Sequence, residues 1–212
     1  MKKFILVIIL SIGLIPTHAQ NDPRAVKLLN QVTAKLKSYK NIQAEFKYVL
    51  TNKKAGVKSE TKGKVFIQGN KFHANYMGID DIYDGKKRFQ IVHENEEINV
   101  STHKDDDAFT PDKIFTFYEK GYRQLWDIKQ KIKGRNIQYI KLIPKDSKSS
   151  EAYILLGIDI QNKNIYNVIV KEKDGSLITF EFTKFLTNQI LPQKLFEFNK
   201  NKYKDYYINE MD

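Results

Sequence analysis

The chain has 212 residues, of which 41% are hydrophobic and 29% are charged, and it contains no cysteine. This length supports one domain with a substantial buried core, and the composition excludes collagen-like, coiled-coil and disulfide-scaffold proteins. The 36 basic and 25 acidic residues give a net charge of +11, but the 12% aromatic content and the dispersed charges argue against intrinsic disorder.

The first nineteen residues have the pattern of a secretory signal peptide. Lys2 and Lys3 precede an apolar stretch over 4–15, and the small residues Thr17 and Ala19 lie just before Gln20. The apolar stretch has about 12 residues, whereas a membrane-spanning helix needs about 20. We therefore expect residues 1–19 to be removed on export and residues 20–212 to form a single domain.

The exported chain keeps an excess of basic residues, with 34 Lys and Arg against 25 Asp and Glu, or +9. A basic exported protein is suited to anionic membrane surfaces or acidic partners. Nucleic acid is not an expected partner outside the cytoplasm.

An amphipathic helix is predicted at the start of the exported chain. Asp22 followed by Pro23 is typical of a helix N-cap and the first helical position. Apolar residues then recur at helical spacing over about four turns. They are Ala25, Leu28, Leu29, Val32, Leu36 and Tyr39.

From residue 42 onward the spacing of apolar residues changes to every second position, which predicts half-buried antiparallel strands. Turn signals such as Asp84-Gly85 and Asp174-Gly175 separate the segments, because both residues of such turns reach positive φ readily. The predicted strands are 42–51, 57–68, 71–77, 81–83, 88–93, 97–101, 122–131, 136–144, 152–159, 165–171 and 177–185, with a further candidate at 195–198.

The segment 103–120 interrupts this series of strands. It begins with the acidic run Asp105, Asp106 and Asp107, which we expect to be a solvated loop. A short helix should follow, with Thr110 as N-cap, Pro111 at the first position and Gly121 as the stop. Its apolar residues at helical spacing are Ile114, Phe115, Phe117 and Tyr118.

About eleven antiparallel strands and two or three helices place the chain in the mainly β (α+β) class. A sheet with two apolar faces needs cover on at least one of them. A strongly curved sheet with helices packed into its concave side meets that requirement.

Catalytic motifs are poorly represented. The three histidines after residue 19, His73, His93 and His103, are widely spaced, and the chain has neither a nucleophile-elbow nor a zinc-protease motif. Spacing alone does not exclude a pair of carboxylates for glycoside hydrolysis. However, Trp126 is the only tryptophan, and carbohydrate clefts usually have more such platforms. A hydrolase therefore ranks third among the possible functions, behind the two binding functions given below.

Two groups of acidic residues resemble possible metal sites. Neither has the spacing and the terminal glutamate of a calcium-binding EF-hand loop. We interpret the first group as part of a hairpin and the second as a solvated loop, and we expect no metal and no cofactor. The groups are Asp80, Asp81 and Asp84, and His103 with Asp105, Asp106 and Asp107.

Five local patterns, in order along the chain, resemble the periplasmic lipoprotein carrier (LolA) family in the divergent form typical of Bacteroidetes-like sequences. They are LKSYKNIQAEF over 36–46, KGKVFI over 62–67, YDGK over 83–86, DDAFTPDKIF over 106–115 and LFEF over 195–198. The third pattern is a hairpin, the fourth resembles the inserted lid segment and the fifth a closing strand.

The resemblance implies an unclosed antiparallel β-barrel of about 11 strands with an α-helical lid on its concave face. It also implies a periplasmic chaperone that binds lipoprotein acyl chains in a hydrophobic cavity and carries them from the inner to the outer membrane. The implied partners are these acyl chains, an inner-membrane lipoprotein-releasing transporter and an outer-membrane acceptor that the sequence does not identify. We expect a monomer.

The predicted ligand-binding residues combine inward strand positions with apolar positions of the helix and the lid. Inward aromatic residues of a small β-fold usually fill its core, so one such residue does not distinguish a core from a cavity. The predicted set is Leu29, Leu36, Phe46, Tyr48, Val65, Ile67, Phe72, Tyr76, Phe89, Ile91, Ile114, Phe115, Phe180 and Phe182.

One position departs from the family pattern. Gln68-Gly69-Asn70 stands where well-known members carry an arginine before a proline, so no functional arginine is transferred. Lys71 and Arg88 are near in sequence but do not match the motif, which leaves open whether a basic residue replaces it. The alternative function is a periplasmic sensor or interaction module that uses the same half-barrel to recognise a lipidated or protein signal.

Overall fold

The structure is a computed structural model that describes residues 20–102 and 110–211. The predicted signal peptide, His103 and the acidic run Asp105, Asp106 and Asp107 lie outside the described residues. No helix in the described part of the chain is long and apolar enough to cross a membrane.

The predicted first helix is confirmed as α1 (Pro23–Ser38). Asp22 caps it, because its side chain accepts a hydrogen bond of 2.8 Å from the backbone N–H of Arg24. The helix buries one face, formed by Ala25, Leu28, Leu29 and Val32.

The strands form a single sheet, and all eleven predicted strands are present with ends shifted by no more than two residues. In chain order the strands are β1 (Ile42–Asn52), β2 (Val57–Gln68), β3 (Lys71–Tyr76), β4 (Ile79–Tyr83), β5 (Arg88–Val92), β6 (Glu97–Ser101), β7 (Tyr122–Ile132), β8 (Arg135–Pro144), β9 (Glu151–Asp159), β10 (Ile165–Glu172), β11 (Leu177–Thr187) and β12 (Tyr207–Met211).

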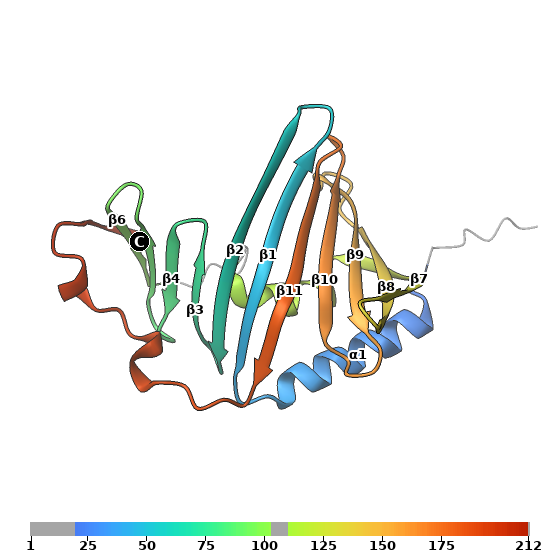
Figure 1. Cartoon of the computed structure of the whole chain (residues 1–212), viewed down its shortest axis with the longest axis horizontal. Coiled ribbons are helices and arrows are strands. Elements are labelled where there is room, and N and C mark those ends of the chain that lie inside the picture. The colour runs from blue at the N-terminus through green and yellow to red at the C-terminus, as the bar shows by residue number, and fades with distance from the viewer. Residues whose placement is uncertain (1–19, 103–109, 212) are drawn as a thin grey trace, which may run out of the picture.

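The order across the sheet is β12-β6-β5-β4-β3-β2-β1-β11-β10-β9-β8-β7 (Figure 1). All neighbouring strands are antiparallel except β12, which runs parallel to β6. Because β7 and β12 are the two ends of this order, the sheet is open. This confirms the prediction of an unclosed barrel.

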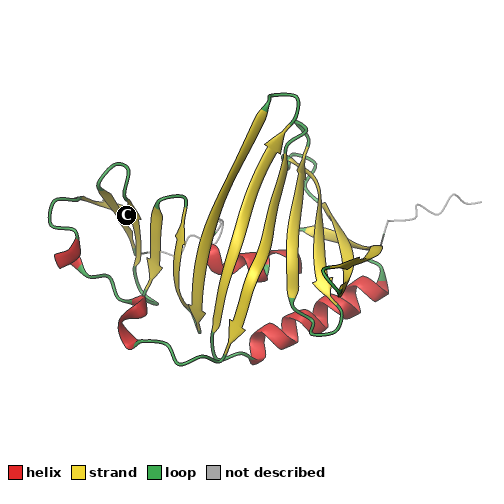
Figure 2. Cartoon of the chain, viewed as in Figure 1, coloured by secondary structure: helices red, strands yellow, loops and turns green. Residues whose placement is uncertain are grey.

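The prediction of a strand at 195–198 is wrong. Pro192 begins a turn there, and Leu195 N–H donates to the Pro192 carbonyl at 3.0 Å, so the chain forms the short 3₁₀ helix η3 (Gln193–Phe196). A second one, η4 (Lys200–Lys202), follows before the twelfth strand. Figure 2 shows these short helices between β11 and β12.

The predicted lid helix is two 3₁₀ helices, η1 (Pro111–Phe115) and η2 (Phe117–Glu119), rather than one α-helix. Backbone hydrogen bonds join residues three apart, as from Lys113 N–H to the Thr110 carbonyl at 2.9 Å. Thr116, with φ of −132°, separates the two helices. Thr110 precedes η1, but its hydroxyl makes no capping hydrogen bond.

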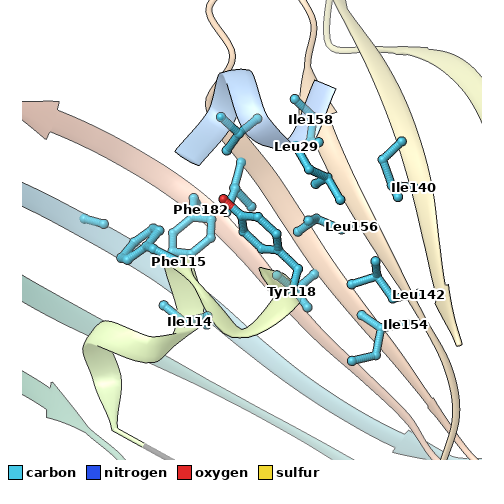
Figure 3. Packing of buried hydrophobic residues seen from close by; sticks show 14 of the residues in the cluster. Leu29, Ile114, Phe115, Tyr118, Ile140, Leu142, Ile154, Leu156, Ile158 and Phe182 are labelled. Carbon is cyan, nitrogen blue, oxygen red and sulfur yellow. The ribbon is translucent and has the colours of Figure 1, made fainter. Parts of the chain in front are cut away.

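The main core lies between α1, the two lid helices and one face of the sheet, which we call the inner face. Figure 3 shows Phe115 beside Phe182, and Leu29 of α1 near Leu156 and Ile158 of β9. A second core lies on the opposite, outer face of β4–β6, where the C-terminal segment covers Ile82, Ile91, Ile98 and Val100.

Candidate functional site

An apolar cavity of about 260 Å³ lies between η1 and the inner face of the sheet. It opens where β3 ends and β2 continues alone beside β1, because β3 pairs with β2 only as far as Gly63. The cavity is lined by Phe46, Tyr48, Thr61, Val65, Ala74, Tyr76, Met77, Pro111, Ile114 and Phe180.

Three aromatic rings from adjacent strands form one wall of the cavity. Tyr48 of β1 is the register partner of Phe180 of β11, and their ring centroids are 5.1 Å apart in an edge-to-face arrangement. Phe46, two residues before Tyr48 and on the same face, lies 6.1 Å from the Phe180 ring. Such pairs hold one another in fixed orientations, which gives the wall a defined shape.

Gly63 shapes the floor beneath this wall. It is the register partner of Phe46 on β2. A Cβ atom at Gly63 would meet the Phe46 ring and would lie 2.9 Å from the backbone oxygen of Asn75. The missing side chain therefore makes room for the Phe46 ring to lie across β2.

The roof of the cavity is η1. Pro111 and Ile114 face the cavity, whereas Phe115 is 2% exposed and its ring stacks on Phe182 at a centroid distance of 5.2 Å. One short helix thus contributes both to the cavity and to the main core.

The roof is also held by polar contacts through η2. The Tyr118 hydroxyl lies 3.1 Å from the Thr33 hydroxyl of α1, and the Tyr118 carbonyl accepts a hydrogen bond from Gln124 Nε2 of β7 at 3.0 Å. Burial raises the pKa of Tyr118 to about 12, so the hydroxyl stays neutral at physiological pH.

A buried ion pair lies beside the cavity, behind Tyr76. Asp81 is 0% exposed and accepts hydrogen bonds from Arg88 Nε at 2.9 Å, Arg88 Nη2 at 2.7 Å and the Tyr76 hydroxyl at 3.0 Å. Burial and the charge of Asp81 raise the pKa of Tyr76 to about 12. Among the described residues that line the cavity, the only polar side-chain groups are the hydroxyls of Tyr48, Thr61 and Tyr76.

Arg88 faces the same side of the sheet as the lid. Burial alone would lower its pKa, but the hydrogen bonds and charge of Asp81 outweigh burial and raise it, and the charge of Asp112 on η1 adds to this effect. A basic residue therefore does lie near the roof of the cavity, although on β5 and not at 68–70.

The structure brings six of the predicted ligand-binding residues together in the cavity, namely Phe46, Tyr48, Val65, Tyr76, Ile114 and Phe180. Six others lie elsewhere on the inner side. Leu29, Phe115 and Phe182 are buried in the main core, and Leu36 and Ile67 pack against it. Phe72 is fully buried and stacks on Tyr83.

The prediction that Phe89 and Ile91 face the cavity is wrong. On β5 the register partner of the inner-face residue Asp81 is Gln90, so Phe89 and Ile91 point to the outer face. They belong to the second core, where the Phe89 ring stacks on Phe198 at 4.4 Å.

Four cavity residues were missed, namely Thr61, Ala74, Met77 and Pro111. Thr61 and Ala74 follow from strand alternation once Val65 is placed inward. Met77 is 54% exposed in the turn between β3 and β4, with φ of 50°. An apolar methionine in a tight turn, where polar residues are usual, could have indicated that this turn borders the cavity.

Comparison with known proteins gives a family and a fold. The family model described as "Outer membrane lipoprotein carrier protein LolA" matches residues 37–199. No curated protein matches the chain.

Among solved structures, an uncharacterized conserved protein from Thermus thermophilus has a TM-score of 0.60 at 10% identity, covering 89% of this chain and 99% of its own. A LolA superfamily protein from Nitrosomonas europaea has a TM-score of 0.44 at 11% identity, with 81% and 96% covered. The Mycobacterium tuberculosis lipoprotein LppX has a TM-score of 0.45 at 12% identity, with 81% and 99% covered. The Thermus structure shares the fold.

Proposed function

Because the chain belongs to the outer membrane lipoprotein carrier protein LolA family, we propose that it is a periplasmic, non-enzymatic carrier of lipoproteins. In this proposal the acyl chains enter the apolar cavity under η1, and the protein carries them from the inner to the outer membrane. The observation that supports it most is the cavity itself, whose wall is aromatic and aliphatic and whose roof is a short helix.

The size of the cavity fits a carrier whose roof moves. Ligand pockets usually measure about 300–1,000 Å³, so a cavity of about 260 Å³ accommodates part of an acyl chain. Each buried methylene contributes about 0.8 kcal/mol. Several methylenes thus give useful affinity, whereas complete burial of two or three chains requires η1 to move outward and would make release slow.

The proposed location and partners follow from the same role. We propose that residues 1–19 are removed on export, that residues 20–212 form one monomeric domain in the periplasm, and that an inner-membrane lipoprotein-releasing transporter loads it. Amino-terminal sequencing of the exported protein should begin at or near Gln20. Retention of residues 1–19 in a membrane fraction would argue against this location.

Binding of a fluorescent fatty acid, with displacement by a diacylated lipopeptide, tests the proposal. Phe180→Asp places a charge on the cavity wall and should weaken probe binding at least tenfold, since burying an unpaired carboxylate is costly. Thr61→Trp fills the cavity without adding a charge and should weaken binding as well. Lys47→Ala is the matched control, because Lys47 follows Phe46 on β1, points to the other face and pairs with Glu60 at 2.8 Å.

Folding of each variant is checked by circular dichroism and urea unfolding before binding is compared. If the well-folded wild type binds neither the fatty acid nor the lipopeptide, the carrier proposal fails. The sensor or interaction module, which uses the same half-barrel to recognise a protein signal, would then be favoured.

A further inference from the structure

A second groove, of about 350 Å³, lies between α1, the β7–β8 hairpin and the turn after β9. Four cationic side chains line it, and none of the described residues contributes a carboxylate to the lining. The cations are Arg24, Lys27, Lys129 and Lys163. The rest of the lining is the Trp126 ring, two glutamines and the apolar side chains of Leu28 and Ile160.

Three separate elements bring these cations together. Arg24 and Lys27 lie three residues apart and therefore on one face of α1. On β7 a bulge between Trp126 and Lys129 places Lys129 opposite Gln138, on the same inner face as Trp126. Lys163 has φ of 59°, and its ammonium donates to the Ile160 carbonyl at 2.7 Å, which fixes it at the groove.

The charges of the three lysines are not compensated. Arg24 is bound by Asp22 through contacts of 2.8 and 3.1 Å. Lys27, Lys129 and Lys163 form no ion pair with any residue in 20–102 or 110–211. A concave site with about three free positive charges attracts an anion of similar charge density.

The remaining lining indicates which kind of anion fits. The Arg24 guanidinium lies 5.3 Å from the Trp126 ring centroid, and the Ile160 side chain lies beside Lys163 in the lining. Tryptophan and long basic side chains are the residues that proteins place at the headgroup level of a bilayer. We propose that this groove binds the phosphate headgroups of anionic phospholipids and so docks the protein on membrane surfaces.

The membrane context of this inference rests on the proposed function, but the groove shares no lining residue with the acyl cavity in the described part of the chain. The proposal for the groove and the proposal for the acyl cavity can therefore be refuted independently of each other. Substitutions in the groove should leave fatty-acid binding unchanged, which is measured on the same protein samples.

Trp126 is the only tryptophan of the chain, so its fluorescence reports directly on the groove. We expect vesicles of phosphatidylcholine with phosphatidylglycerol to shift its emission to the blue in a saturable way, and pure phosphatidylcholine vesicles to have no effect. Added salt should weaken the effect by screening.

The variant that tests the site combines Lys27→Gln, Lys129→Gln and Lys163→Gln. Removing three lysines near an anionic surface should weaken vesicle binding about a hundredfold. The matched control, Lys58→Gln, Lys86→Gln and Lys202→Gln, loses the same net charge at exposed positions outside the groove and should bind as the wild type does.

Three results would overturn the inference. One is equal loss of vesicle binding in the control variant, which would mean that diffuse charge is responsible. Another is an emission change with inorganic phosphate or an acidic peptide but none with vesicles, which would make the groove a small-anion or protein site. The third is no response to anionic vesicles while fatty-acid binding is intact.

Discussion

At the scale of single residues, the buried pair of Asp81 and Arg88 is the most sensitive polar feature. Asp81→Asn would leave the Arg88 guanidinium, whose side chain is 13% exposed, without the carboxylate that it binds at 2.7 Å. Breaking such a pair costs about 3 kcal/mol or more. Urea unfolding should show this loss, whereas Lys47→Ala, which removes an exposed pair with Glu60, should cost less than about 1 kcal/mol. Equal effects would contradict the buried-pair account.

Asp80 gives the protein an acid-sensitive contribution to stability. Its pKa lies well below the ordinary value of 3.8, first because His73 Nε2 lies 3.7 Å from its carboxylate and then because Asn75 and His93 form hydrogen bonds with it at 2.7 and 3.0 Å. A lowered folded-state pKa stabilises the fold above the unfolded pKa, and this stability is lost as the pH falls through the folded pKa.

Asp80→Asn should therefore destabilise the protein above about pH 4 and have progressively less effect at lower pH. The same cluster holds the C-terminal segment, since His73 Nδ1 lies 2.8 Å from the Leu195 carbonyl oxygen and His93 Nδ1 lies 3.1 Å from the Tyr206 hydroxyl. Urea unfolding of both proteins across pH measures the difference. A difference that does not depend on pH would contradict this assignment.

At the scale of elements, the lid depends on a few apolar anchors. Segments as short as η1 and η2 are not stable as isolated helices, so they are ordered by the burial of Ile114, Phe115 and Tyr118. Phe115→Ala should cost about 3–5 kcal/mol of docking free energy. We expect it to increase hydrogen exchange at 110–119 without unfolding the sheet.

Hydrogen exchange with and without a lipopeptide tests whether this segment moves. Amides of 110–119 should be less protected than those of β1 and β11 and should respond to the ligand. Thr116→Ala is the control, because Thr116 is exposed between the two short helices, and it should leave exchange at 110–119 unchanged. Protection equal to that of the central strands, with no response to ligand, would mean that the segment is a static plug.

The sequence predicted the strands well because alternation and turn signals are local. It misjudged features that depend on distant parts of the chain. β12 exists because Tyr207–Met211 pairs with β6, more than a hundred residues earlier. Phe89 and Ile91 could not be assigned to a face from alternation, because the C-terminal segment makes the outer face of β5 apolar as well. Of the six predicted residues that line the cavity, Phe46, Tyr48 and Phe180 lie on one face of the central β1–β11 pair.

At the scale of the whole molecule, different parts of the chain cover the two faces of the sheet. The family match ends at residue 199, and the residues beyond it form η4 and the edge strand β12, with Tyr203, Tyr206 and Ile208 packed against the outer core. Deleting residues 200–212 should expose Phe89 and Phe198, lower stability and promote association. Fatty-acid binding should persist, because the described residues of this segment do not line the cavity. Loss of binding in a folded, monomeric deletion variant would contradict the separation of the two faces.

The central claim is that the cavity carries the acyl chains of lipoproteins. Native mass spectrometry of the protein, purified gently from the cells that make it, tests this claim most directly. We predict a species with the mass of one chain plus one acylated lipoprotein, which is lost in Phe180→Asp and kept in Lys47→Ala. A wild-type protein that carries no lipid, or only a partner protein without acyl groups, would contradict the account.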